Sequence, residues 1–141
     1  MAVVYSGPKN PPIQTFIRVQ LQEIAWNNQL AGETLTAFDV VFNDGGFWKK
    51  TDAHNVLKAV PPFGVAQAAA ASGAVLPVWI RAIVSNGSWS LTSGAKVFLA
   101  SGGSLTATPP AASGDTVAVI GWAIGVRTME LRTEPPVMIG Q

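Results

Sequence analysis

Short apolar segments separated by glycine-rich turns make up most of the chain from residue 32 onward. Turns are indicated around Gly45-Gly46, Asn86-Gly87, Gly102-Gly103 and Gly114-Asp115. Between these turns the pattern predicts strands over residues 34–42, 47–53, 75–85, 88–92, 95–100, 104–108, 116–126 and 129–133. Several short strands with turn signals about every ten residues are typical of a sandwich or barrel. We therefore predict an all-β, single-domain β-barrel or β-sandwich.

Two segments fit the strand pattern less well. The apolar positions of residues 13–26 fit one face of a helix, but residues 17–22 also alternate between apolar and polar side chains. We favour a strand there, followed by a turn over residues 27–32. Residues 66–74 are rich in alanine, which would allow a short helix ending at Gly73.

Prolines distinguish the first sixteen residues from the rest of the chain. Proline fixes φ and disfavours helical geometry in the residue before it, so residues 1–16 are predicted to form an extended N-terminal arm. A β-barrel domain is predicted over residues 17–141. The arm carries apolar side chains that a solvated tail would not need, and its candidate binding residues are Val3, Val4, Tyr5, Pro8, Pro11, Pro12, Ile13 and Phe16.

One supersecondary pattern occurs twice. Gly45 and Gly102 lie 57 positions apart, and so do Gly64 and Gly121. Each occurrence contains a strand, a Gly-Gly hairpin, a second strand, a proline-containing connection and an apolar strand with Gly-x-Ala at its centre. A glycine inside a strand indicates a bulge or a close backbone approach. The fold is therefore predicted to contain two related β units, over about residues 32–78 and 88–134.

Composition narrows the range of partners. Only 12% of the residues are charged, the formal net charge is +1, and the basic residues are scattered. We therefore expect neither nucleic acid nor an anionic membrane as a partner. The start of the chain lacks a signal-peptide pattern, and the weakly polar stretch over residues 64–80 is interrupted by polar residues, glycine and proline. A surface poor in charge suggests that partners cover much of it.

The inventory of reactive side chains is small. There is no cysteine, His54 is the only histidine, and the eight carboxylates are spread singly. These residues offer no obvious catalytic triad or clustered metal site, so we predict that the protein is not an enzyme and has no cofactor or small-molecule substrate. His54 is interpreted as a loop residue. Asp44, Asp52 and Asp115 flank turns, where a carboxylate accepts hydrogen bonds from backbone N–H groups or, alternatively, binds calcium.

Five tryptophans are open to two interpretations. They could stack on sugars, as in carbohydrate-binding modules, or they could anchor the core and subunit interfaces, which is the more common role. The residues concerned are Trp26, Trp48, Trp79, Trp89 and Trp122.

The second unit resembles structural proteins of tailed bacteriophages. In residues 87–139 a strand, "AKVFLA", leads to "GGSLT", a proline-containing loop, "GDTVAVIGWA" and a last strand before a proline-rich end. The first unit, from "AGETLTAFDVVFNDGGFWKKTDA" to "FGVAQAAAASGAVLPV", looks like the upstream half of capsid decoration (cement) proteins. The two matches cover about three quarters of the chain, whereas residues 1–19 match no part of the pattern.

The resemblance implies a virion structural protein that binds the outer surface of the phage capsid and stabilises the head. The implied partner is the major capsid protein, and the implied state is a homotrimer on the capsid exterior, assembled in the host cytoplasm. The proline-rich arm would then bind the capsid or a neighbouring subunit. The alternatives are a head-fibre or tail-fibre receptor-binding module and, third, a carbohydrate-binding β domain.

Overall fold

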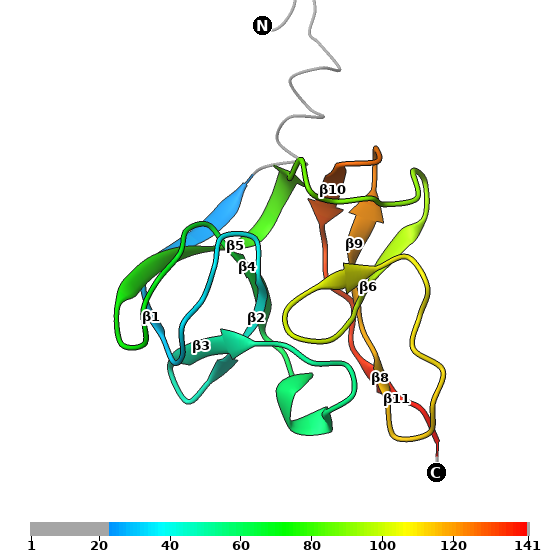
Figure 1. Ribbon diagram of the computed structural model, residues 1–141, viewed down its shortest axis with the longest axis horizontal. Coiled ribbons are helices and arrows are strands. Elements are labelled where there is room, and N and C mark those ends of the chain that lie inside the picture. The colour runs from blue at the N-terminus through cyan, green and yellow to red at the C-terminus, as the bar shows by residue number, and fades with distance from the viewer. Residues whose placement is uncertain (1–22, 141) are drawn as a thin grey trace, which may run out of the picture.

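A computed structural model describes residues 23–140, which form eleven strands and one 3₁₀ helix, η1 (Val56–Lys58). The predicted all-β fold is confirmed: no α-helix occurs in this part of the chain (Figure 1). The strands are β1 (Ile24–Ala31), β2 (Val40–Asp44), β3 (Phe47–Lys50), β4 (Phe63–Ala66), β5 (Val75–Ser85), β6 (Lys96–Leu99), β7 (Leu105–Thr106), β8 (Thr116–Val117), β9 (Val119–Ala123), β10 (Thr128–Leu131) and β11 (Val137–Met138).

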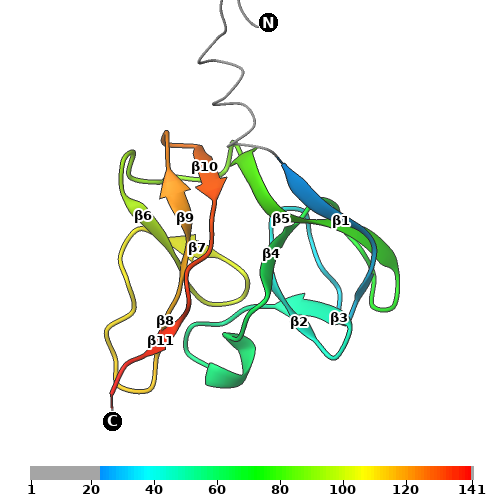
Figure 2. The same ribbon diagram turned by 180° about the vertical axis from the view of Figure 1, so that it is seen from behind.

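The first five strands close into a small barrel. Their order is β1-β3-β2-β4-β5, and an additional pairing between β1 and β5 closes the circle (Figure 2). Closure removes the free strand edges that would otherwise be available for pairing with another chain. Trp48 is the largest of the fully buried side chains inside the barrel, and its Nε1 donates a hydrogen bond of 2.9 Å to Gln29 Oε1. We call this interior the barrel core: Ala31, Leu35, Val41, Trp48, Ala66, Ala70, Leu76 and Val78.

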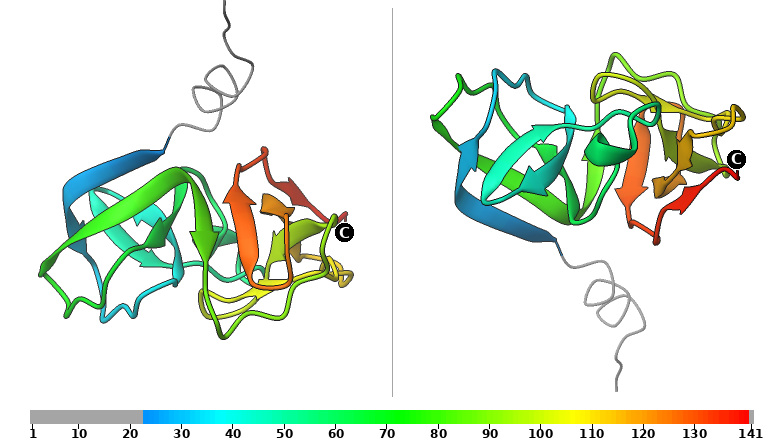
Figure 3. Two further views of the ribbon diagram at one scale, coloured as in Figure 1. Left: turned by 90° about the horizontal axis from the view of Figure 1, so that it is seen from above. Right: turned by 90° about the horizontal axis from the view of Figure 1, so that it is seen from below.

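The C-terminal half of the chain extends the sheet beyond the barrel. The last residues of β5 pair with β10, and the sheet continues through β9, β6 and β7. Strands β8 and β11 form a separate two-stranded sheet. Seen from above, the barrel and this second half lie beside one another, joined by the long strand β5 (Figure 3).

A second core fills the space between the two halves. Along β2, Val40 and Phe42 belong to this second core, whereas Val41 between them belongs to the barrel core, as the two-residue period of a strand requires. The second half contributes Leu99, Ile120 and other side chains. We call this cluster the shared core, because both halves of the described chain build it.

The strand order is symmetric about the β5–β10 pairing. Reading outward, β5, β4, β2 and β3 on one side correspond to β10, β9, β6 and β7 on the other. Gly-Gly turns with positive φ join β2 to β3 and β6 to β7, so both predicted hairpins are confirmed. The order of elements agrees with the two units expected from the sequence, although their boundaries at about 32–78 and 88–134 stay a prediction.

The glycines at the centres of β4 and β9 occupy equivalent positions. A β-carbon on Gly64 would lie 2.8 Å from the carbonyl oxygen of Trp79, and one on Gly121 would lie 2.1 Å from that of Glu130. Both distances are shorter than van der Waals contact allows. The close backbone approach predicted at these two glycines is therefore confirmed.

Several local predictions were wrong. The strand predicted over residues 34–42 begins only at Val40, because residues 37 and 38 form a turn. Residues 66–74 form no helix, because their backbone groups bond to the barrel instead; Leu35 and Ala70 exchange hydrogen bonds of 2.8 and 3.0 Å. Residues 88–92 form no strand. The chain turns at residues 87 and 88, where the Asn86 side chain accepts a hydrogen bond from Ser88 N. The turn expected over residues 27–32 is a bulge within β1.

The predicted arm over residues 1–16, and the part of the chain up to residue 22, lie outside the described residues. The strand favoured over residues 13–26 can be compared only from residue 23 onward, where β1 begins at Ile24.

Candidate functional site

An exposed row of apolar side chains crosses three strands of the barrel. Leu30 of β1 lies opposite Phe47 of β3 on one side and opposite Val75 of β5 on the other. Directly opposed residues share one face of a sheet, so the three side chains form a contiguous row. They are 37%, 43% and 58% exposed, respectively. We call these three residues the apolar row.

Two further apolar side chains of β1 are exposed near the start of the described chain. Ile24 and Trp26 are 45% and 41% exposed. The ring of Trp26 meets that of Trp48 in an edge-on contact with the centroids 6.0 Å apart, so one part of Trp26 lies on the barrel core while the rest is open to solvent. Strand β1 therefore presents apolar surface at both ends, with Ile24 and Trp26 near its start and Leu30 near its end.

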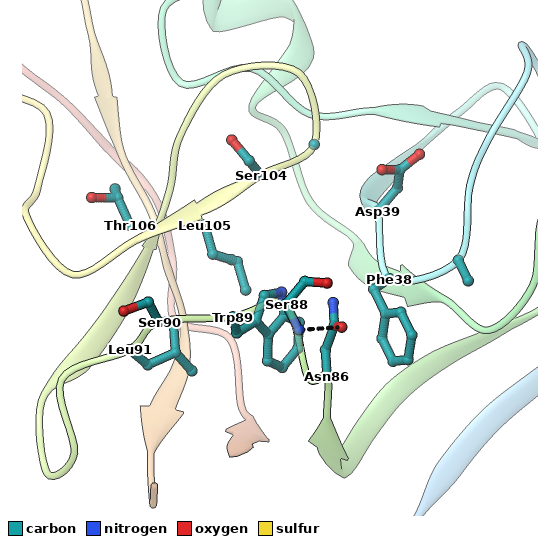
Figure 4. Close-up of a pocket in the computed structure, with 12 residues that line it drawn as sticks. Phe38, Asp39, Asn86, Ser88, Trp89, Ser90, Leu91, Ser104, Leu105 and Thr106 are labelled. Carbon is teal, nitrogen blue, oxygen red and sulfur yellow. Dashed lines mark hydrogen bonds between the residues drawn. The ribbon is translucent and has the colours of Figure 1, made fainter. Parts of the chain in front are cut away.

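A cleft opens between the two halves of the molecule (Figure 4). It has a volume of about 420 Å³, which is within the range of small-ligand sites. Three segments line it: residues 37–39 before β2, residues 86–91 after β5, and residues 103–106 at β7. The lining combines the aromatic rings of Phe38 and Trp89 with hydroxyl and amide groups, and its one charged side chain is Asp39.

Phe38 stands at the centre of an aromatic group in this cleft. Its ring centroid is 5.9 Å from that of Trp89 and 6.2 Å from that of Trp79. Its backbone has a φ of +72°, in the left-handed region that bulky residues rarely adopt. The backbone N–H of Phe38 donates to the carbonyl of Ala66, and Asp39 accepts from Thr36 N through its side chain, which holds this turn in place.

His54 and Asp115 form a hydrogen bond between the two halves, and this contact is an ion pair when His54 is protonated. His54 Nδ1 donates to Asp115 Oδ1 over 2.9 Å, and the Asp115 side chain is nearly buried whereas His54 is exposed. The hydrogen bond to Asp115 and the attraction of its charge raise the pKa of His54 above its ordinary value. His54 does lie in a turn, as predicted, but its partner 61 positions away was not foreseen.

The three turn aspartates act as local hydrogen-bond acceptors or ion-pair partners. Asp52 accepts from His54 N, Asp115 accepts from Ala112 N, and Asp44 pairs with Lys49 over 3.0 Å. Within residues 23–140 no group of three or more histidine, cysteine, aspartate or glutamate side chains comes together as a metal site would require.

The five tryptophans separate into different roles. Trp48 is a core residue, and Trp79 is partly buried and donates through Nε1 to Glu23. Trp122 lies beneath the ammonium group of Lys96, whose nitrogen is 5.3 Å from the ring centroid. Trp89 lines the cleft and Trp26 adjoins the exposed end of β1. The tryptophans do not form a single row that would serve as a stacking platform.

Sequence reasoning placed all candidate binding residues in the arm and missed both the apolar row and the cleft. The arm residues Val3, Val4, Tyr5, Pro8, Pro11, Pro12, Ile13 and Phe16 lie outside the described residues. An apolar residue directly after the Gly-Gly turn, Phe47, was the available signal for the row. For the cleft the one sequence signal was Trp89, named among the tryptophans that could stack on sugars; the other lining residues are brought together by long-range pairing that the sequence does not show.

The chain matches no protein-family model, and no curated protein and no solved structure is significantly similar to it. Among the described residues there is no helix with the length and apolar character needed to cross a bilayer.

Proposed function

We propose that this protein is a virion structural protein that binds the outer surface of a tailed-phage capsid and stabilises the head, with the major capsid protein as its partner. On this proposal it acts as a homotrimer, a state that sedimentation velocity of the free protein would test. The motif resemblance over residues 87–139 supports the class of protein. The exposed apolar surface of the barrel is the structural observation that supports a binding role.

One residue of the apolar row, Leu30, lies on β1, the described strand that is nearest in sequence to the arm. Strand β1 begins two residues after residue 22, the last of the N-terminal residues outside the described range. On this proposal the arm and the apolar row contact the same neighbouring capsomer. Apolar surface removed from water contributes about 25 cal/mol per Å², and a stable contact needs about 1,000 Å² or more in total.

Few charges oppose such a contact. The apolar row contains no ionisable group, and the charges on the hairpin that carries Phe47 include an ion pair, Lys49 with Asp44. Desolvating an apolar row carries no charge-burial penalty, whereas burying an unpaired charge costs several kcal/mol. This surface therefore suits a permanent contact with a rigid lattice.

Co-sedimentation with heads that lack the protein tests the proposal. We expect deletion of residues 1–12 to reduce occupancy sharply, and Phe47→Ser to weaken the affinity about thirtyfold, because truncating a buried aromatic anchor typically costs about 2 kcal/mol. Leu57→Ser is the matched control, since Leu57 is 78% exposed but lies on η1 and not on the row.

Two results would contradict the proposal. Full occupancy of both the truncated protein and Phe47→Ser would exclude the arm and the row as the attachment surface. An equal loss with Leu57→Ser would mean that general surface hydrophobicity, not this row, carries the binding. Circular dichroism of each variant separates lost binding from lost folding.

A further inference from the structure

The cleft between the two halves has the properties of a preformed ligand site. Its walls come from both halves, and hydrogen bonds fix them to one another: Val40 N donates to the carbonyl of Gly103 over 2.9 Å, and Gly103 N donates to that of Thr51 over 2.8 Å. The Gly-Gly hairpin of the second half is thus fastened to the barrel beside Asp39. The cleft does not have to form when a ligand arrives.

The backbone of Phe38 adopts a strained conformation at the edge of the cleft. Glycine or asparagine normally occupies a position at φ +72°, and a bulky residue there costs about 1–3 kcal/mol. Such outliers concentrate at ligand sites. The strained turn holds the phenyl ring against Trp89 in the wall of the cleft, where both rings are only partly buried.

Several polar groups in the cleft have capacity for further hydrogen bonds. The side-chain amide nitrogen of Asn86 and the hydroxyls of Ser88 and Ser90 have no partner among residues 23–140. Asp39 uses one carboxylate oxygen to accept from Thr36 N, which leaves the other oxygen as an acceptor. Donors and acceptors therefore surround the two aromatic rings.

The chemistry of the lining selects one ligand class. Hydroxyl, amide and carboxylate groups around aromatic rings complement a molecule with many hydroxyls and an apolar face, which describes a pyranose ring. The cleft contains no lysine or arginine, and Asp39 would repel an anion, so phosphorylated and acidic sugars are disfavoured. We propose that the Phe38–Trp89 cleft binds a short neutral glycan. This site is separate from the apolar row and does not depend on the capsid-binding proposal.

The test is a glycan array of neutral oligosaccharides built from glucose, galactose, mannose and N-acetylglucosamine, probed with the full-length protein. Calorimetry then measures the dissociation constant of the best binder. We expect Phe38→Gly and Trp89→Ala each to weaken binding about tenfold through loss of aromatic contact. Glycine accepts the positive φ without strain, so Phe38→Gly removes the ring while retaining the turn.

A second variant covers the case in which the aromatic substitutions disturb the fold. Ser88→Ala with Ser90→Ala removes two exposed hydroxyls that make no internal hydrogen bond within the described residues, and we expect binding to fall about fivefold with the melting temperature unchanged. Trp26→Ala, which removes an exposed tryptophan outside the cleft, should bind as the unmodified protein does. No binding on the array at millimolar concentration, or binding that survives the serine changes, would overturn the proposal, as would equal loss with Trp26→Ala.

Discussion

At the scale of single residues, Gly64 and Gly121 set the distance between neighbouring strands. A methyl group at Gly121 would lie 2.1 Å from a backbone oxygen of β10, and a backbone atom cannot move aside as a flexible side chain can. We expect Gly121→Ala to destabilise the fold by about 3 kcal/mol or more, and Gly64→Ala by about 2–3 kcal/mol. Denaturant unfolding monitored by circular dichroism measures both values.

Gly87→Ala is the control for this prediction. Gly87 has no neighbouring atom within 4 Å of the added β-carbon and no positive φ, so its substitution should change stability by less than about 0.5 kcal/mol. If Gly121→Ala were as mild as Gly87→Ala, the strands would not be as close as described.

The ion pair of His54 and Asp115 predicts a pH-dependent stability. The folded pKa of His54 is raised, so the protonated form is favoured in the folded state. The pair therefore contributes fully below the unfolded pKa of about 6.5, and its contribution is lost as the pH rises through the raised folded value. We expect the melting temperature of the protein to exceed that of His54→Ala at about pH 6, and this difference to shrink by about pH 9.

Asp115→Asn is the control, because it retains the shape of the side chain and removes the charge. Its melting temperature should show the same loss of pH dependence over this range. Asp52 also raises the pKa of His54, so a small residual dependence is expected in Asp115→Asn. A constant difference between the protein and His54→Ala from about pH 6 to pH 9 would contradict the assignment.

The roles of some residues could be predicted from the sequence, and the roles of others could not. The Gly-Gly pairs and the strand glycines were predictable, because their roles follow from local geometry that few other residues can adopt. The left-handed backbone of Phe38 was not predictable, since nothing in its neighbourhood distinguishes it from an ordinary core phenylalanine. The contact between His54 and Asp115 depends on the packing of segments far apart in the sequence, so no local sequence pattern predicts it.

At the scale of elements, the alternation of apolar and polar residues predicted most strands. It failed in segments whose conformation is determined by tertiary contacts. Strand β5 was predicted at its observed bounds, residues 75–85, because its apolar run is long and flanked by turn residues. The alanine-rich segment after β4 has high helix propensity, but pairing of Ala70 with Leu35 in the barrel outweighs it. The pairing of β1 with β5, which closes the barrel, could not be predicted from the sequence either, because strands about fifty residues apart share no local sequence pattern.

At the scale of the whole molecule, the shared core couples the barrel to the second half. If the second half unfolded alone, Val40, Phe42 and Val65 on the outside of the barrel wall would become exposed to water, and β5 would lose its pairing with β10. The loss of this buried apolar surface makes independent unfolding unfavourable. The two units are therefore expected to unfold together despite their separate positions in the sequence.

Because of this coupling, a substitution in one half should destabilise the other half as well. Leu99→Ala opens a cavity in the shared core and should cost about 2–5 kcal/mol. Because unfolding is cooperative, the amides of Val41 and Trp48 in the barrel should lose hydrogen-exchange protection by the same free energy, and calorimetry should record a single transition.

Leu76→Ala, in the barrel core alone, serves as the reciprocal variant and should reduce protection of Ile120 in the second half. Two calorimetric transitions, or a loss of protection confined to the substituted half, would mean that the barrel and the second half are separate folding units and that the shared core is only a contact between them.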